Sequence, residues 1–182
     1  MLPIVTDRLR LRPLEPEDAQ AIANLVGNWN VARWLARVPF PYTIADAEAF
    51  IVHARTGGAA ADGAIAAITR DDQLIGLVSI EPRHHGMELG YWLGEPFWGN
   101  GYMSEAAAAL VSAFFHRSDA DALQAGYFEG NHASARILTG LGFEACGQGQ
   151  QMSLPNRRAM PDTAMRLTRE RFASLNSRTT NP

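Results

Sequence analysis

The sequence predicts an α/β (α+β) fold in which a mixed six- or seven-stranded sheet is flanked by helices on both faces. Segments with strand and helix patterns alternate along the chain without an internal repeat. An extended apolar segment at 87–93 enters a glycine-rich turn and then an alanine-rich helix at 102–115. The next predicted strand, at 122–128, should lie parallel to the strand at 87–93, because a helical crossover joins the two.

Local patterns in the first third of the chain place one strand and two helices. A strand at 9–14 precedes a helix that opens at Pro16 with acidic residues in its first turn and ends at Gly27. Thr43 and Asp46 resemble a capping box at the start of a helix that reaches about residue 55. These helices supply one of the two layers that cover the sheet.

The remaining elements are mostly strands. Residues 57–63 are rich in glycine and alanine and predict a flexible connection within the domain. Further elements are a hairpin of strands at 64–69 and 74–81, strands at 144–150 and 160–167, and a short helix at 169–175. We expect one domain over 1–182, with a core at about 6–176.

Composition excludes several protein classes. A chain of 182 residues can bury about 70% of its unfolded surface and needs no disulfide to be stable. The single cysteine, Cys146, cannot form an internal disulfide, and a free thiol favours a reducing compartment, so we expect a cytoplasmic protein. The net charge of −3 argues against general nucleic-acid binding, and no apolar run is long enough to cross a membrane.

The segment at 94–105, GEPFWGNGYMSE, predicts a phosphate-binding turn. Gly99 and Gly101 can adopt backbone angles that other residues avoid, and they allow an oxyanion to approach the main chain. The first turn of the following helix offers unpaired N–H groups and the positive end of the helix dipole. The turn is therefore suited to an anion.

Two common phosphate-binding motifs do not fit this turn. Gly94 and Gly99 have the spacing of a P-loop, but Asn100 and Gly101 stand where that motif needs lysine and a hydroxyl residue. A dinucleotide fingerprint would need a third glycine where this chain has Ser104. The remaining interpretation is a diphosphate held by the backbone without a metal ion.

The turn resembles a known family. Residues 98–103, WGNGYM, are similar to the coenzyme A pyrophosphate loop of the GNAT N-acetyltransferases, in the form typical of the branch that acetylates ribosomal-protein N-termini (the RimJ/RimL branch). Residues 131–136, NHASAR, with the LGF of 141–143, resemble a second element of that branch, and the opening TDRLRLR at 6–12 resembles its start. Three segments in the right order make the resemblance specific, and it spans nearly the whole chain.

The resemblance implies a fold and a ligand. It implies that the strands at 87–93 and 122–128, the fourth and fifth of that fold, splay apart, and that the backbone of the first bonds the pantetheine arm of acetyl-CoA. Asn131 and Arg136 lie beside the cofactor in this interpretation, although capping explains Asn131 and solvent exposure explains Arg136 equally well. The expected cofactor-binding residues are Tyr91, Trp92, Leu93, Trp98, Gly99, Asn100, Gly101, Tyr102, Met103, Ser104, Asn131, Ser134 and Arg136.

The resemblance also implies direct transfer of the acetyl group to an amine, without an acyl-enzyme. Glu88 is the expected base, since it precedes the pantetheine strand on a mostly apolar segment; an exposed strand glutamate is the alternative. The backbone amide of Tyr91 is the expected oxyanion donor. The Ser134 hydroxyl is expected at the sulfur, with simple solvent exposure as the alternative.

Two residues depart from the family pattern. Met103 stands where the pyrophosphate loop usually has a small residue, and Leu138 stands where many members have a tyrosine that reprotonates the thiolate. The acid must then come from elsewhere or from water. These departures keep open a second function class, a catalytically idle domain that binds coenzyme A or an acyl-CoA as a sensor.

The sequence leaves the acceptor and the oligomeric state open. A peptide N-terminus and a small amine, such as an aminoglycoside, polyamine or amino acid, both fit, and so do a monomer and a homodimer. Specificity is expected from 26–41 and 148–161, which carry no signature. We expect a core position for Cys146, with a nucleophile as the alternative, and core positions for Trp29 and Trp34, with substrate stacking as the alternative. We expect no metal site, because His84 and His85 adjoin in a turn without ligand spacing.

Overall fold

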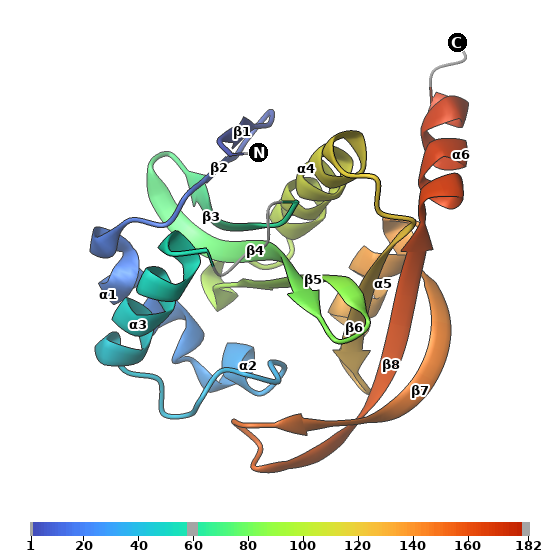
Figure 1. Cartoon of the computed structure of the whole chain (residues 1–182). Coiled ribbons are helices and arrows are strands. Elements are labelled where there is room, and N and C mark those ends of the chain that lie inside the picture. The colour runs from blue at the N-terminus through green and yellow to red at the C-terminus, as the bar shows by residue number, and fades with distance from the viewer. Residues whose placement is uncertain (1, 58–61, 180–182) are drawn as a thin grey trace.

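The computed structural model describes residues 2–57 and 62–179 of the chain. Its centre is a mixed eight-stranded sheet in the order β1-β2-β3-β4-β5-β6-β8-β7 (Figure 1). All neighbouring strands are antiparallel except β5 and β6, which are parallel as predicted. The strands are β1 (Ile4–Val5), β2 (Arg10–Arg12), β3 (Ala64–Arg70), β4 (Gln73–Arg83), β5 (Gly86–Leu93), β6 (Ala122–Phe128), β7 (Glu144–Ser153) and β8 (Arg158–Thr168).

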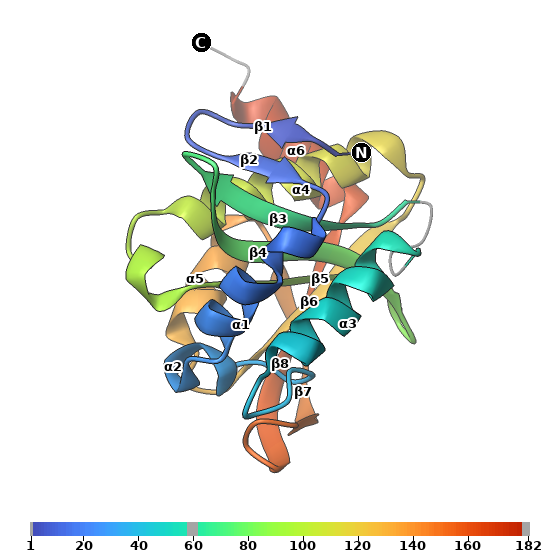
Figure 2. The same cartoon turned by 90° about the vertical axis from the view of Figure 1, so that its left-hand side faces the viewer.

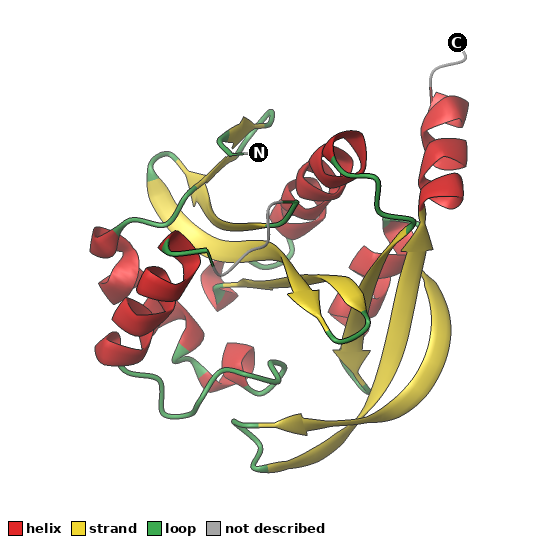
Figure 3. Cartoon of the chain, in the orientation of Figure 1, coloured by secondary structure: helices red, strands yellow, loops and turns green. Residues whose placement is uncertain are grey.

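Helices cover both faces of the sheet (Figures 2 and 3). Side chains of α1 and α3 pack with one face of β3 and β4, and side chains of α4 and α5 pack with the other face. The helices are α1 (Ala19–Val26), α2 (Trp29–Ala32), α3 (Ile44–Arg55), α4 (Tyr102–Arg117), α5 (His132–Gly140) and α6 (Arg169–Thr179), with short 3₁₀ turns η1 (Pro16–Asp18) and η2 (Glu95–Phe97).

The central strands are apolar because both of their faces are covered. Six of the seven residues of β3 are buried, and Ile68 and Ile75 are fully enclosed. Phe114 of α4 is also completely buried in the core, a burial that contributes about 1.5–3 kcal/mol of stability. The core therefore fixes α4, and with it the turn that precedes α4.

Local chemistry sets the element ends much as the sequence predicts. Thr43 accepts a hydrogen bond from the Asp46 N–H, and Asp46 bonds back to the Thr43 N–H, so the predicted capping box begins α3. Asp71 and Asp72 both have positive φ in the β3–β4 turn, the conformation that a tight hairpin requires. The strand predicted at 122–128 matches β6.

Four parts of the fold differ from the prediction. The sheet has eight strands because Ile4–Val5 adds a short edge strand, and β2 is shorter than 9–14 because Pro13 has no N–H to donate. The four-residue α2 is too short to show helical periodicity. The β7–β8 hairpin is longer than predicted, and the flexible connection expected at 57–63 falls mostly on 58–61, outside the described residues.

No helix within the described ranges is long and apolar enough to span a membrane.

Candidate active site

A gap between β5 and β6 opens the sheet at its centre. The two strands pair at a single position, Glu88 with Gln124, although both continue for several residues beyond it (Figure 1). Backbone groups of β5 on that side therefore have no strand partner past Glu88. This agrees with the splay that the family resemblance implies.

A cavity of about 900 Å³ lies at this gap and is lined by residues from both faces of the sheet. Because side chains alternate along a strand, Glu88, Gly90 and Trp92 face the α1–α3 side while Tyr91 and Leu93 face α4 and α5. Every residue that the sequence nominates for the site lines the cavity except Asn100: Glu88, Tyr91, Trp92, Leu93, Trp98, Gly99, Gly101, Tyr102, Met103, Ser104, Asn131, Ser134 and Arg136.

The turn before α4 has the backbone that the glycines predict. Gly99 and Gly101 have φ values of +77° and +76°, and no other group lies within 4 Å of the space a Gly99 side chain would fill. The Trp98 indole donates to the Leu93 carbonyl at 2.7 Å, which ties the turn to the end of β5. Asn100 lies outside the cavity, where its side-chain amide bonds the Phe97 and Trp98 carbonyls and shapes the turn.

The N-terminal segment holds this turn from outside. The Arg8 guanidinium donates to the Glu105 carboxylate at 2.7 Å and to the Asn100 carbonyl at 3.0 Å. The Thr6 hydroxyl donates to the same carboxylate at 2.6 Å. Burial opposes ionisation of Glu105, but these hydrogen bonds outweigh it and lower its pKa. Glu105 thus joins two segments that are far apart in the sequence.

Met103 does not fill the turn with its side chain. It is 5% exposed and packs in the core with Ala106 and Ala107, while part of it borders the cavity. A bulky side chain is therefore accommodated at this position without blocking the glycines.

Two hydroxyl groups meet on the α5 side of the gap. The Tyr91 and Ser134 hydroxyl oxygens are 2.9 Å apart, and Asn131 caps α5 by accepting a hydrogen bond from the Ser134 N–H at 3.1 Å. Burial raises the pKa of Tyr91 to about 12 despite the bond to Ser134. Leu138 is fully buried in the core, so no polar group reaches the site from that position.

The opposite face of the gap carries two carboxylates. The Arg37 guanidinium lies 3.2 Å from the Glu88 carboxylate, and the Arg83 guanidinium lies 3.8 Å from the same oxygen. The second carboxylate, Asp162 on β8, stands opposite Phe128 of β6, and burial raises its pKa. Sequence reasoning missed Asp162, because a single aspartate in a strand forms no motif.

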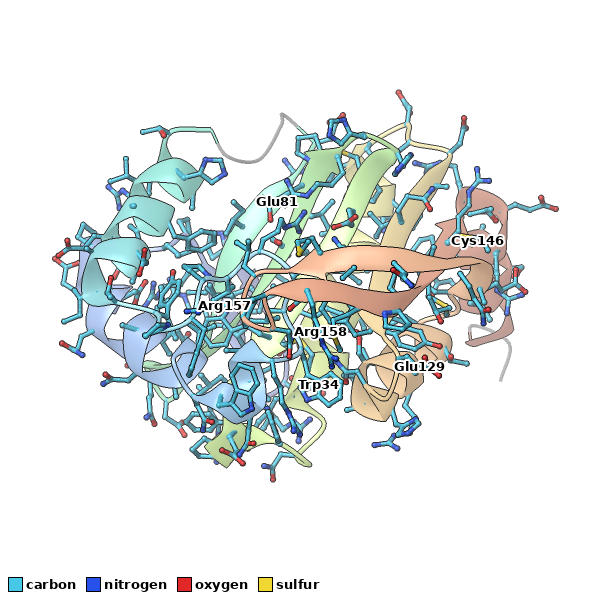
Figure 4. The ribbon with its side chains drawn as sticks, turned by 90° about the horizontal axis from the view of Figure 1, so that it is seen from below. Trp34, Glu81, Glu129, Cys146, Arg157 and Arg158 are labelled. Atoms are coloured by element: carbon cyan, nitrogen blue, oxygen red, sulfur yellow. The ribbon has the colours of Figure 1, made fainter. Side chains whose placement is uncertain are left out.

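The β7–β8 hairpin closes this face. In Figure 4, seen from below, the hairpin passes in front of the other strands, with Arg157 at its turn. The Leu154 N–H donates to the Ala36 carbonyl at 2.8 Å, and the Asn156 side chain donates to the Arg33 carbonyl at 2.8 Å. The segments 26–41 and 148–161, which the sequence nominates for specificity, therefore meet at one end of the cavity.

Three residues expected in the core lie elsewhere. Cys146 is exposed, at a bulge in the edge strand β7, and it borders the cavity. Trp29 is 42% exposed and packs edge-on against Phe40, while Trp34 lines the cavity. The prediction was wrong for these residues because an apolar or small side chain in a strand or short helix does not reveal which face is covered.

The histidines form no cluster with other ligand residues. His85 lines the cavity and His84 does not, which fits two adjacent side chains that point apart. Within the described part of the chain, no three His, Cys, Asp or Glu side chains gather as metal ligands.

Known proteins are similar to this chain in sequence and in fold. Residues 8–144 match the family model described as acetyltransferase (GNAT) domain. The chain is 31% identical over 162 residues to the uncharacterized N-acetyltransferase YoaA of Bacillus subtilis. The aligned stretch covers 86% of this chain and 91% of that protein. The chain is also similar to the ribosomal-protein-serine acetyltransferase of Escherichia coli K12. The two are 45% identical over 47 residues, which is 24% of this chain and 26% of that protein.

The same fold occurs in a solved structure of RimL, a ribosomal L7/L12 α-N-protein acetyltransferase in complex with coenzyme A. The TM-score is 0.75 at 20% identity, and the match covers 92% of this chain and 98% of that one. These similarities agree with the predicted branch. The chain belongs to the GNAT acetyltransferase family.

Proposed function

We propose that the protein transfers the acetyl group of acetyl-CoA directly to a primary amine that approaches from the opposite face of the sheet. The observation that carries the proposal is the gap at which β5 and β6 pair through one residue only. A cavity reaches this gap from an anion-suited turn on one side and from a carboxylate-bearing face on the other. Two ligands can therefore meet at the gap in a ternary complex.

The turn before α4 is the proposed diphosphate site. N–H groups at 99–104 and the positive end of α4 would hold the anion, an arrangement worth roughly 0.3–2 kcal/mol from the helix dipole alone. Arg136 lines the cavity and would contribute a cation to a phosphate. Unpaired backbone groups of Tyr91, Trp92 and Leu93 would bond the pantetheine amides as a neighbouring strand does.

The proposed chemistry uses groups on both faces of the gap. The Tyr91 amide would donate to the carbonyl oxygen as negative charge develops there. Ser134, bonded to the Tyr91 hydroxyl, would return a proton to the departing sulfur, which supplies the acid that Leu138 cannot. On the other face, one of the two carboxylates, Glu88 or Asp162, would take the proton that the amine loses.

The proposed acceptor is the N-terminal amine of a protein. The ribosomal-protein-serine acetyltransferase of Escherichia coli and RimL both have ribosomal proteins as acceptors in their names, which favours this choice. The cavity end formed by the β7–β8 hairpin and the segment after α2 would receive the first residues of the peptide. A small amine is the competing acceptor.

Thiol release from acetyl-CoA, measured across short N-terminal peptides, spermidine, an aminoglycoside and free amino acids, tests this function. The proposal expects release with peptides that exceeds release with the small amines. Fast release with a small amine alone would correct the acceptor. Tight binding of coenzyme A without release for any amine would instead favour an idle binding domain.

A further inference from the structure

The face of the gap opposite the α4 turn, here called the acceptor face, holds two carboxylates in different surroundings. Glu88 lies on β5 at the position where β5 and β6 are joined, and Asp162 lies on β8 opposite Phe128, at the end where the strands have diverged. Their partners on β6, Gln124 and Phe128, are four positions apart, which is about 13 Å along the strand. Both side chains line the cavity, so either can meet an incoming amine.

Glu88 already has cationic partners. Arg37 lies 3.2 Å from its carboxylate and Arg83 lies 3.8 Å away, and Arg83 also pairs with Glu81 at 3.1 Å. An ammonium group at Glu88 would therefore compete with cations that already neutralise this carboxylate. The arrangement is suited to holding Arg37 over the cavity.

Asp162 has no such partner. It forms no ion pair within the described residues, and it stands between buried Phe128 of β6 and Gly149 of β7. A side chain on Gly149 would begin 3.3 Å from an Asp162 carboxylate oxygen, so the glycine keeps that side of the carboxylate uncovered. Burial without a compensating cation raises the pKa of the Asp162 carboxyl, as the task of a base near neutral pH requires.

We infer that Asp162 binds the acceptor ammonium and takes its proton, and that Glu88 positions Arg37. This assignment rests on the proposed acetyl transfer. The ammonium gives one proton to the Asp162 carboxylate, and the free nitrogen lone pair forms the C–N bond as the C–S bond breaks. The nitrogen then loses its second proton, which replaces the proton that the Ser134 hydroxyl gives to the departing thiolate, and Asp162 returns the first proton to water.

Other charged or ionisable side chains border this face of the cavity. The segment after α2 carries Arg37, the β4–β5 turn carries His85, and β5 and β7 carry Glu88 and Cys146. Arg158 and Arg166 stand on β8, four residues to either side of Asp162. His85 also lines the cavity, and an imidazole is a common general base, so His85→Asn is a necessary control.

The test compares Asp162→Asn with Glu88→Gln in the full chain, with acetyl-CoA and a short peptide amide that carries an N-terminal serine. We expect Asp162→Asn to lower kcat/KM for the peptide by about 10²–10⁴-fold, the usual contribution of a general base, and to leave the coenzyme A Kd unchanged. Glu88→Gln should change kcat/KM by less than about tenfold, through KM. Asp162→Glu should restore part of the rate.

The pH profile separates proton transfer from a structural role. A peptide amine loses its proton near pH 8, so the deficit of Asp162→Asn should shrink as the pH rises towards 9, while His85→Asn follows the wild type. A deficit that is constant with pH, or a larger loss in Glu88→Gln, would overturn the assignment. A wild type that releases no thiol would contradict the proposed acetyl transfer, and with it the role assigned to Asp162.

Discussion

The hydroxyl oxygens of Tyr91 and Ser134 lie 2.9 Å apart on the cofactor face of the gap. Because the pKa of Tyr91 is raised to about 12 by burial, its phenol stays protonated at every working pH and can donate to Ser134. We predict that Tyr91→Phe and Ser134→Ala each slow the transfer step by about tenfold or more, with little change in coenzyme A affinity. Single-turnover kinetics measures this step.

The two groups should act as one unit. The double variant should then be little slower than the slower single variant, because removal of either hydroxyl breaks the same path. Fully multiplicative losses in the double variant would show that the two hydroxyls act independently.

The turn before α4 should depend on its left-handed glycines. Alanine at Gly101, where φ is +76°, costs about 1 kcal/mol or more in the present backbone, and relief of that strain moves the N–H groups. We predict a coenzyme A Kd roughly five- to tenfold higher for Gly101→Ala, measured by calorimetry.

Gly140→Ala is the matched control for this prediction. Gly140 ends α5, its φ is not in the positive range, and no atom would meet its added methyl within 4 Å. An equal loss of affinity in both variants would show that the turn geometry is not what matters.

The contact between the β7–β8 hairpin and the segment after α2 should govern the acceptor. Asn156 bonds the Arg33 carbonyl at 2.8 Å and the Ser153 hydroxyl at 2.8 Å, and two hydrogen bonds contribute about 1–3 kcal/mol together. We predict that Asn156→Ala raises KM for the amine several-fold and leaves the coenzyme A Kd unchanged. Exposed Gln73 on β4 offers a control away from the hairpin, and Gln73→Ala should behave as the wild type in both measurements.

Stability should fall in acid through the Arg12–Asp18 pair. Burial alone would raise the pKa of Asp18, but hydrogen bonds from Arg12 at 2.7 Å and from the Glu15 N–H outweigh it and lower the pKa. A lowered native pKa adds stability that is present above the unfolded pKa of about 3.9 and is lost as the pH falls through the native value.

We therefore expect Asp18→Asn to lower the free energy of unfolding by about 2 kcal/mol at pH 7, with a smaller difference from the wild type near pH 3. Urea denaturation at both pH values measures the difference. Asp7→Asn, at an exposed position, should have no effect; a gap between Asp18→Asn and wild type that is the same at both pH values would contradict the account.

Much of the fold could be predicted because its signals are local. The Thr43 capping box, the glycines at 99 and 101 and the Asn131 cap each act within a few residues, and the structure contains all of them. The parallel β5–β6 pair followed from the helix between the strands. Such features depend on backbone conformation, which neighbouring residues determine.

The missing parts depend on contacts between distant segments. Glu105 bonds Arg8 across 97 positions of the sequence, and Asn156 bonds Arg33 across 123. Asp162 reaches the cavity because β8 pairs with β6, and no residue near Asp162 in sequence reveals that pairing. The turn proposed for the cofactor was thus predictable from a compact motif, whereas the residues of the proposed acceptor side come together only when the chain folds.

A crystal structure with bound coenzyme A would locate both ends of the cofactor. We expect the diphosphate within hydrogen-bond distance of the N–H groups at 99–104 and the sulfur at the β5–β6 gap, beside the Ser134 hydroxyl. A diphosphate bound away from this turn, or a sulfur that does not reach the gap, would contradict the proposed cofactor site.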